Sequence, residues 1–276
     1  MSLKTLQRYL RQFRRHTGNT VEYFRLTFEG DQVERVTDFK ALKRPVLLLH
    51  GYGGTRRVFK VLERRLRRDG FSVFSLKLGG IFDTFNTKPI PDLASFVAKK
   101  IESLYRRHGI REKLIIVGHS KGGLIGRCYI KHFEGHRRVK TLITMGTPHN
   151  GNPWAILALL TPLALLTESL RQMTPVSPFI RRLNKTPWPE DVKVVSIYSK
   201  GDTVCPYPSA VLKTSAGSKV KNIEMSDISH VEFLMKKQVY GLIRQEILEE
   251  KAAAARSPLR RKIQKAGSNN KSRALG

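Results

Sequence analysis

The sequence predicts an α/β fold in which helices flank a mostly parallel central sheet. Short apolar segments alternate with amphipathic helical segments along most of the 276 residues, and this alternation is the pattern of repeated βαβ units. Hydrophobic residues make up 40% of the chain, which is enough for a large core. The length suits one large domain, or one domain with a modest insertion.

Six short apolar segments are expected to be strands. The third of them is apolar throughout, which indicates burial on both faces of a parallel sheet. The predicted strands cover residues 45–49, 72–76, 114–117, 139–145, 192–198 and 220–225.

Helices are expected between these strands, because apolar residues recur there at helical spacing. Pro91 begins the second helix, where its missing N–H costs nothing, and Gly109 ends it. The predicted helical segments contain Val58, Leu62 and Leu66; then Leu93, Phe96, Val97, Ile101, Leu104 and Tyr105; then residues 121–133; and last Leu234, Met235, Val239, Leu242 and Ile243.

Residues 151–190 interrupt the alternation with a long, apolar, proline-rich stretch. We interpret this stretch as a lid or cap insertion over one end of the sheet, since long insertions in such positions are usually functional. The main domain is predicted to cover 21–250. A basic amphipathic helix over 1–20 precedes it, expected to pack on the domain, with a membrane surface as the alternative. A basic, disordered tail over 251–276 follows it.

The chain is strongly basic, with 51 basic and 22 acidic residues and a formal net charge of +29. Such a surface attracts anionic lipid headgroups or nucleic acid, and charge alone does not choose between them. The alternative is that a basic proteome or a solubility tail accounts for the charge. Peripheral contact with an anionic membrane is the partner that we favour. No specific nucleic-acid partner is predicted, because the basic ends contain no interleaved aromatic residues and no recognition motif.

The cysteine pattern and the apolar runs exclude several classes of protein. Cys128 and Cys205 show no Cys-x-x-Cys or Cys/His spacing, so we expect no metal and two free thiols. Basic residues interrupt the N-terminal segment, and the longest apolar run, 154–166, is broken by Thr161 and Pro162. Neither a signal peptide nor a spanning helix is therefore expected, and the predicted location is cytoplasmic or peripheral to a membrane.

The central motif is Gly118-His119-Ser120-Lys121-Gly122, which matches G-x-S-x-G. It follows one predicted strand directly and precedes one predicted helix, the context of a nucleophile elbow. The tight turn requires glycine beside the serine and holds the serine oxygen out at the carboxyl edge of the sheet. Ser120 is therefore the predicted nucleophile. The side chain of Lys121 is expected to point to solvent, the alternative being a position near the mouth that attracts an anionic substrate.

A second glycine-rich motif, His50-Gly51-Tyr52-Gly53-Gly54, follows the first predicted strand. Acyl transfer needs hydrogen-bond donors fixed where the oxyanion develops. One donor is expected to be the amide after the nucleophile, that of Lys121, and the other the amide of Tyr52 in this loop.

A nucleophilic serine needs a base, and the base needs an acid that orients it. Asp202 follows a late strand in a Gly-Asp turn, and His230 is the one histidine that comes after it. The order serine, acid, histidine predicts Asp202 as the acid and His230 as the base. Asp227 is the rival acid, but it lies three residues from His230. His149 precedes the acid and is interpreted as pocket wall or loop scaffold.

Together these motifs resemble the bacterial triacylglycerol lipase and esterase group of the α/β-hydrolase superfamily. The similar pieces are HG-x-GG, GHSKGG, GTPHNG, GDTVCP and SHVEF, spread over residues 45–240. The resemblance implies an α/β-hydrolase fold, a triad at Ser120, Asp202 and His230, and oxyanion donors at Tyr52 and Lys121. Some of those lipases bind a structural calcium between flanking aspartates, and no matching pair is found here. A lysine after the serine is also unusual for the group.

The predicted function is that of a serine carboxylic-ester hydrolase acting through an acyl-enzyme on a lipid ester, without a metal or organic cofactor. The apolar insertion and the basic surface favour the lipid substrate. One alternative is an acyltransferase or a small-ester esterase with the same triad. Another is a non-catalytic basic module that binds membrane or nucleic acid on a hydrolase scaffold. The sequence leaves the oligomeric state open.

Overall fold

The computed structural model describes residues 42–79, 86–158, 168–214 and 218–249, together with 21, 25, 26, 38 and 39. The predicted N-terminal helix over 1–20 and the tail over 251–276 lie outside the described residues. The chain divides into two compact units, residues 1–236 and 237–276.

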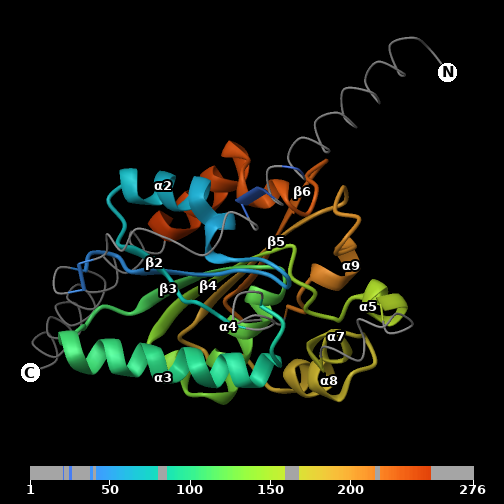
Figure 1. Ribbon diagram of the computed structural model, residues 1–276, viewed down its shortest axis with the longest axis horizontal. Coiled ribbons are helices and arrows are strands. Elements are labelled where there is room, and N and C mark those ends of the chain that lie inside the picture. Colours follow the sequence, from blue (N-terminus) through green and yellow to red (C-terminus); the bar gives the residue numbers. More distant parts are fainter. Residues whose placement is uncertain are drawn as a thin grey trace, which may run out of the picture. The chain divides into compact units, whose positions relative to one another are not determined.

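A six-stranded sheet forms the centre of the first unit, in the order β2-β1-β3-β4-β5-β6. Each pair of neighbouring strands in it is parallel, which confirms the predicted sheet. The carboxyl ends of its strands therefore meet at one edge (Figure 1). The strands are β1 (Val46–Leu49), β2 (Val73–Ser75), β3 (Leu114–His119), β4 (Val139–Met145), β5 (Lys193–Ser199) and β6 (Val220–Met225).

Helices cover both faces of this sheet. Helix α2 lies on one face, while α3 and α4 lie on the other and pack against each other (Figure 1). Gly109 ends α3 in the left-handed conformation with φ 61°, as predicted. The helices and 3₁₀ turns are η1 (Arg56–Phe59), α2 (Lys60–Arg68), α3 (Ile90–His108), α4 (Lys121–His132), η3 (Gly135–Arg137), α5 (Pro153–Ala158), α7 (Glu168–Gln172), α8 (Pro178–Lys185), α9 (Tyr207–Ala210) and η4 (Glu232–Leu234).

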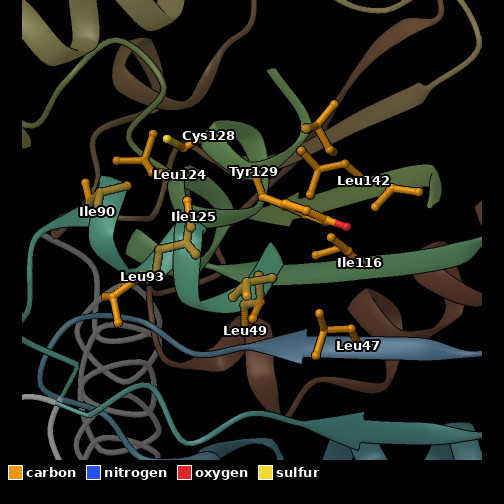
Figure 2. Packing of buried hydrophobic residues seen from close by; sticks show 14 of the residues in the cluster. Leu47, Leu49, Ile90, Leu93, Ile116, Leu124, Ile125, Cys128, Tyr129 and Leu142 are labelled. Atoms are coloured by element: carbon orange, nitrogen blue, oxygen red, sulfur yellow. The ribbon is translucent and has the colours of Figure 1, made fainter. Parts of the chain in front are cut away.

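The core on the α3–α4 face fixes the position of α4. Leu49 of β1, Ile116 of β3 and Leu142 of β4 belong to the buried cluster between the sheet and α4. Ile125 and Tyr129 of α4 belong to the same cluster (Figure 2). All five side chains are at most 1% exposed, and each contributes about 1.5–3 kcal/mol by burial if it behaves as an ordinary core residue. The N-terminus of α4 is therefore held firmly against the sheet edge.

The prediction that Leu234 and Met235 belong to the last helix is wrong. Leu234 lies in the 3₁₀ turn η4, and the helical residues of the second unit are 237–249. The carbonyl of Met235 accepts a hydrogen bond from Arg65 Nη1 at 2.7 Å, so a contact with α2 takes the place of a helical bond.

The predicted insertion, 151–190, contains the helices α5, α7 and α8, with residues 159–167 outside the described part. Its far end is fixed to α4. Arg127 Nη2 and Lys131 Nζ both donate to the carbonyl of Leu183, at 2.9 and 3.1 Å, and both cations face the ring of Trp188. The guanidinium of Arg127 and the amine of Lys131 thus bind the C-terminal end of α8, where the helix dipole favours positive charge. The role of this segment as a lid stays a prediction.

Among the described residues, no helix has both the length and the apolar composition needed to cross a membrane.

Candidate active site

Ser120 occupies a sharp turn between β3 and α4, with φ 54° and ψ −126°. A non-glycine residue rarely adopts this backbone conformation, and doing so costs of order 1–3 kcal/mol. The neighbouring glycines show why the turn is this tight. A Cβ on Gly118 would lie 2.6 Å from Gly123 Cα, and one on Gly122 would lie 1.9 Å from the carbonyl oxygen of Leu49. The backbone therefore makes a tight turn from strand to helix, the setting that a nucleophile elbow requires.

The main chain of Ser120 is tied to the strand next to it. Its N–H donates to the carbonyl of Met145 at 2.9 Å, and its carbonyl accepts from Thr147 Oγ1 at 2.9 Å. His119 and Lys121 on either side are buried, whereas Ser120 itself keeps partial exposure. The turn therefore presents the serine at the carboxyl edge of the sheet.

Asp202 and His230 come together at the same edge. His230 Nδ1 lies 2.8 Å from Asp202 Oδ2. Because a carboxylate only accepts, Nδ1 carries the proton, and Nε2 of the neutral ring is left as an acceptor. This is the tautomer that a general base for a serine hydroxyl requires.

The carboxylate of Asp202 is held rigidly on its other oxygen. Oδ1 accepts from the amides of Val204 and Cys205, at 3.0 and 2.8 Å, and Asp202 is only 3% exposed. Burial and this carboxylate together raise the pKa of the Cys205 thiol. The rival acid, Asp227, is exposed in a turn with φ 56°, so the residue that holds His230 is Asp202.

His119 connects His230 to the turn at Ser120. Its ring packs on the ring of His230 with the centroids 4.6 Å apart, and its Nε2 donates to the carbonyl of His230 at 2.9 Å. Burial holds the pKa of His119 well below its usual value, which keeps this ring neutral. The described structure has no hydrogen bond from Ser120 Oγ to His230, a contact that often tightens only with substrate in place.

The loop after β1 passes directly against the elbow. A Cβ on Gly51 would lie 2.9 Å from Ser120 Cβ, so glycine is what allows this approach. Tyr52, the next residue in the loop, is half-buried. Lys121 is the first residue of α4, and the amides of a first helical turn have no partner within the helix. The two amides predicted as oxyanion donors thus come from adjoining segments.

The side chain of Lys121 does not point to solvent, contrary to our expectation. It is fully buried, and its Nζ donates to the carbonyls of Asn86 and Lys88 at 3.0 and 2.6 Å. Burial holds the pKa of Lys121 well below its usual value. The side chain turns inward because its hydrogen-bond acceptors are main-chain carbonyls more than thirty residues away in sequence. A local sequence pattern does not reveal such partners.

His149 serves as loop scaffold, one of the two roles expected for it. The ring is fully buried and its Nε2 lies 3.0 Å from Thr144 Oγ1. Its carbonyl accepts from Arg127 Nη1 at 3.1 Å, which ties the loop after β4 to α4.

Sequence reasoning missed two residues that shape the acid and histidine loops. Ser199 Oγ accepts from the amides of Gly201 and Ile228, at 3.0 and 2.9 Å, so one hydroxyl joins both loops. Glu232 is buried, and its Oε2 accepts from the amide of Ser229 at 3.0 Å. The spacing Ser-x-x-Glu is a capping-box signal and could have identified Glu232.

Both cysteines are buried free thiols. Among the described residues, no group of three or more His, Cys, Asp or Glu side chains could hold a metal ion.

Comparisons with known proteins agree with this architecture. A family model described as "alpha/beta hydrolase fold" matches residues 44–172. Among solved structures, the mature lipase BlEst2 of Bacillus licheniformis is similar with a TM-score of 0.61 and 17% identity, over 79% of this chain and 96% of that one. Lipase B of Aspergillus fumigatus is similar with a TM-score of 0.60 and 17% identity, over 76% of this chain and 53% of that one.

The esterase RhEst1 of Rhodococcus sp. ECU1013 is also similar, with a TM-score of 0.51 and 14% identity, over 76% of this chain and 92% of that one. At these identities the likeness concerns the fold. Together with the parallel sheet and the matched family model, it shows that the chain has the α/β-hydrolase fold.

Proposed function

We propose that the protein is a serine carboxylic-ester hydrolase with Ser120, Asp202 and His230 as its triad. The observation that carries this proposal is the 2.8 Å bond between His230 Nδ1 and the buried carboxylate of Asp202, at the sheet edge that also presents Ser120. A binding module on the same scaffold has no use for an oriented imidazole beside a strained serine.

In the proposed reaction, His230 Nε2 takes the hydroxyl proton as Ser120 Oγ attacks the ester carbonyl. Asp202 stabilises the imidazolium that forms, and the amides of Tyr52 and Lys121 donate to the oxyanion. The C–O bond to the alcohol breaks as His230 returns the proton to it. Water, deprotonated by the same ring, then attacks the acyl-enzyme and releases the acid.

The insertion supports an apolar acyl group. Trp154 in α5 donates from Nε1 to the carbonyl of Thr203 at 2.8 Å, so the insertion begins beside the acid turn. Trp154, Ile156 and Val204 leave large parts of their apolar side chains exposed there. Exposed apolar surface next to a candidate site favours a lipid ester, and the net charge of +29 favours an anionic interface for it.

A fluorophosphonate probe tests the proposal. The pure protein and Ser120→Ala are treated in parallel, the adduct is located by mass spectrometry, and p-nitrophenyl esters of increasing chain length are assayed. We expect labelling at Ser120 that the variant loses, and faster turnover of longer acyl chains. A folded protein that neither reacts with the probe nor cleaves any of the esters would refute the proposal.

A further inference from the structure

Lys121 is a buried lysine with no acidic partner among the described residues. Its hydrogen bonds go to two main-chain carbonyls, those of Asn86 and Lys88, and its side chain is fully buried at the N-terminus of α4. Burying an ammonium without a carboxylate costs several kcal/mol in typical proteins. A methionine of similar length would avoid that cost, so the lysine needs an explanation beyond packing.

The contacts of Lys121 lead to the loop after β1 by two routes. In the first, Lys121 Nζ bonds the main chain of Asn86 at 3.0 Å, and Asn86 Nδ2 donates to the carbonyl of His50 at 2.6 Å. In the second, Lys121 Nζ lies over the Tyr52 ring, 5.6 Å from its centre. His50 and Tyr52 flank Gly51, the residue that touches Ser120.

This loop needs an external restraint. One internal hydrogen bond closes its turn, from the amide of Gly54 to the carbonyl of Gly51 at 3.3 Å, but its three glycines leave wide conformational freedom, and Gly53 adopts a positive φ of 68°. An oxyanion donor, however, must be held within about 0.5 Å of its working position. Asn86 is fully buried and, bonded to Lys121, provides a fixed point from which the loop can be held.

We propose that the Lys121 side chain is a positioning residue that holds the Tyr52 amide in place for the oxyanion. It acts through Asn86 on the His50 carbonyl and directly on the Tyr52 ring. The main-chain amide of the same residue is the second donor of the proposed function, on which this inference rests. One residue thereby supplies one donor and fixes the other.

The rival explanation is that Lys121 merely stabilises the fold. The two roles predict opposite results for Lys121→Met, which keeps the length of the side chain and removes its donors. Replacing a buried charge by an apolar side chain is often neutral or stabilising. A positioning role therefore gives a folded, slower enzyme, whereas a structural role gives a lower melting temperature with normal turnover per folded molecule.

The kinetic test compares the wild type, Lys121→Met, Asn86→Leu and the double variant on one p-nitrophenyl ester. We expect kcat to fall about 10- to 100-fold for Lys121→Met, as for a displaced donor, with KM changed by no more than about threefold. The kcat of the double variant should be little lower than that of the slower single variant, because both substitutions interrupt the same chain of contacts. Lys99→Met, which removes an exposed lysine on α3, is the matched control and should leave kcat unchanged.

A second measurement does not depend on catalysis. Hydrogen exchange read by mass spectrometry should show faster exchange over residues 50–54 in Lys121→Met than in the wild type, by about tenfold or more. Lys121→Leu, which also removes the donors, replaces the methionine variant if that one fails to fold. Unchanged exchange over 50–54, or a kcat within threefold of wild type, would overturn the inference. A wild type that the fluorophosphonate does not label would refute the proposed function instead, and the exchange result would still decide the positioning.

Discussion

Gly122→Ala should damage both the fold and the site, because two main-chain segments meet at this glycine. The added Cβ would lie 1.9 Å from the carbonyl oxygen of Leu49, whereas real Cβ contacts are essentially never below 3.0 Å. Either the start of α4 or the end of β1 must therefore move by about 1 Å or more. Neither partner is a flexible side chain that can rotate away.

The expected loss of stability lies at the upper end of overpacking effects, about 3 kcal/mol. For a domain of this size, that loss lowers the melting temperature by about 6–12 °C. The movement also displaces either Ser120 or the loop that follows Leu49, and an error of about 1 Å at a reacting centre can cost about 10²-fold in rate. Thermal unfolding and the rate of fluorophosphonate labelling measure the two effects separately.

Two other glycine variants serve as matched controls. Gly126→Ala lies in the same helix, but its nearest neighbour would be Leu142 Cδ1 at 3.0 Å, the end of a side chain that can adjust. Gly241→Ala has no atom within 4 Å of the new Cβ and should gain up to about 1 kcal/mol from helix propensity. If Gly122→Ala melts within about 2 °C of wild type and labels at the same rate, the reasoning about this contact is wrong.

Three further predictions concern the loops and the fixed end of the insertion. Asp202→Asn should leave the protein folded and lower kcat by about 10⁴-fold, measured by ester turnover; turnover within tenfold of wild type would exclude Asp202 as the orienting acid. Ser199→Ala leaves the buried amide of Ile228 without its acceptor and should cost about 1–3 kcal/mol, with Ser226→Ala, at an exposed serine, as the control in thermal unfolding. Burial lowers the pKa of Lys131 from 10.5 to about 7, so the unfolded chain binds the extra proton between those pH values, and stability should rise with pH across that window. The difference in melting temperature between wild type and Lys131→Met, followed from pH 6.5 to 9.5, should show this rise, and a flat difference would contradict it.

Strand and helix positions were predictable because the periodicity that produces them is local. The strand β4 covers residues 139–145, as predicted, since its apolar run ends at a glycine. The last helix was misjudged because the turn over 232–234 depends on Glu232 and on Arg65, which lies 170 residues away in sequence from Met235. Hydrophobic spacing carries no information about such a contact.

The candidate triad was predictable in part for a similar reason. Ser120, Asp202 and His230 each follow a strand, and in a parallel sheet the carboxyl ends of the strands lie at one edge. The supporting residues were not predictable by this route. Lys121 was expected in solvent, but its side chain is buried because it donates to the carbonyls of residues 86 and 88, which are distant in sequence. Likewise, Ser199 joins two loops that meet only in the folded protein.

The backbone of Ser120 has φ 54° and ψ −126°, a conformation that lowers stability for any residue with a side chain. Glycine adopts a positive φ without the penalty that a side chain brings. The free energy of unfolding of Ser120→Gly should therefore exceed that of Ser120→Ala by about 1 kcal/mol or more. Selection for thermal stability alone would therefore favour glycine over serine at position 120, and a catalytic role for Ser120, as proposed, would oppose that preference.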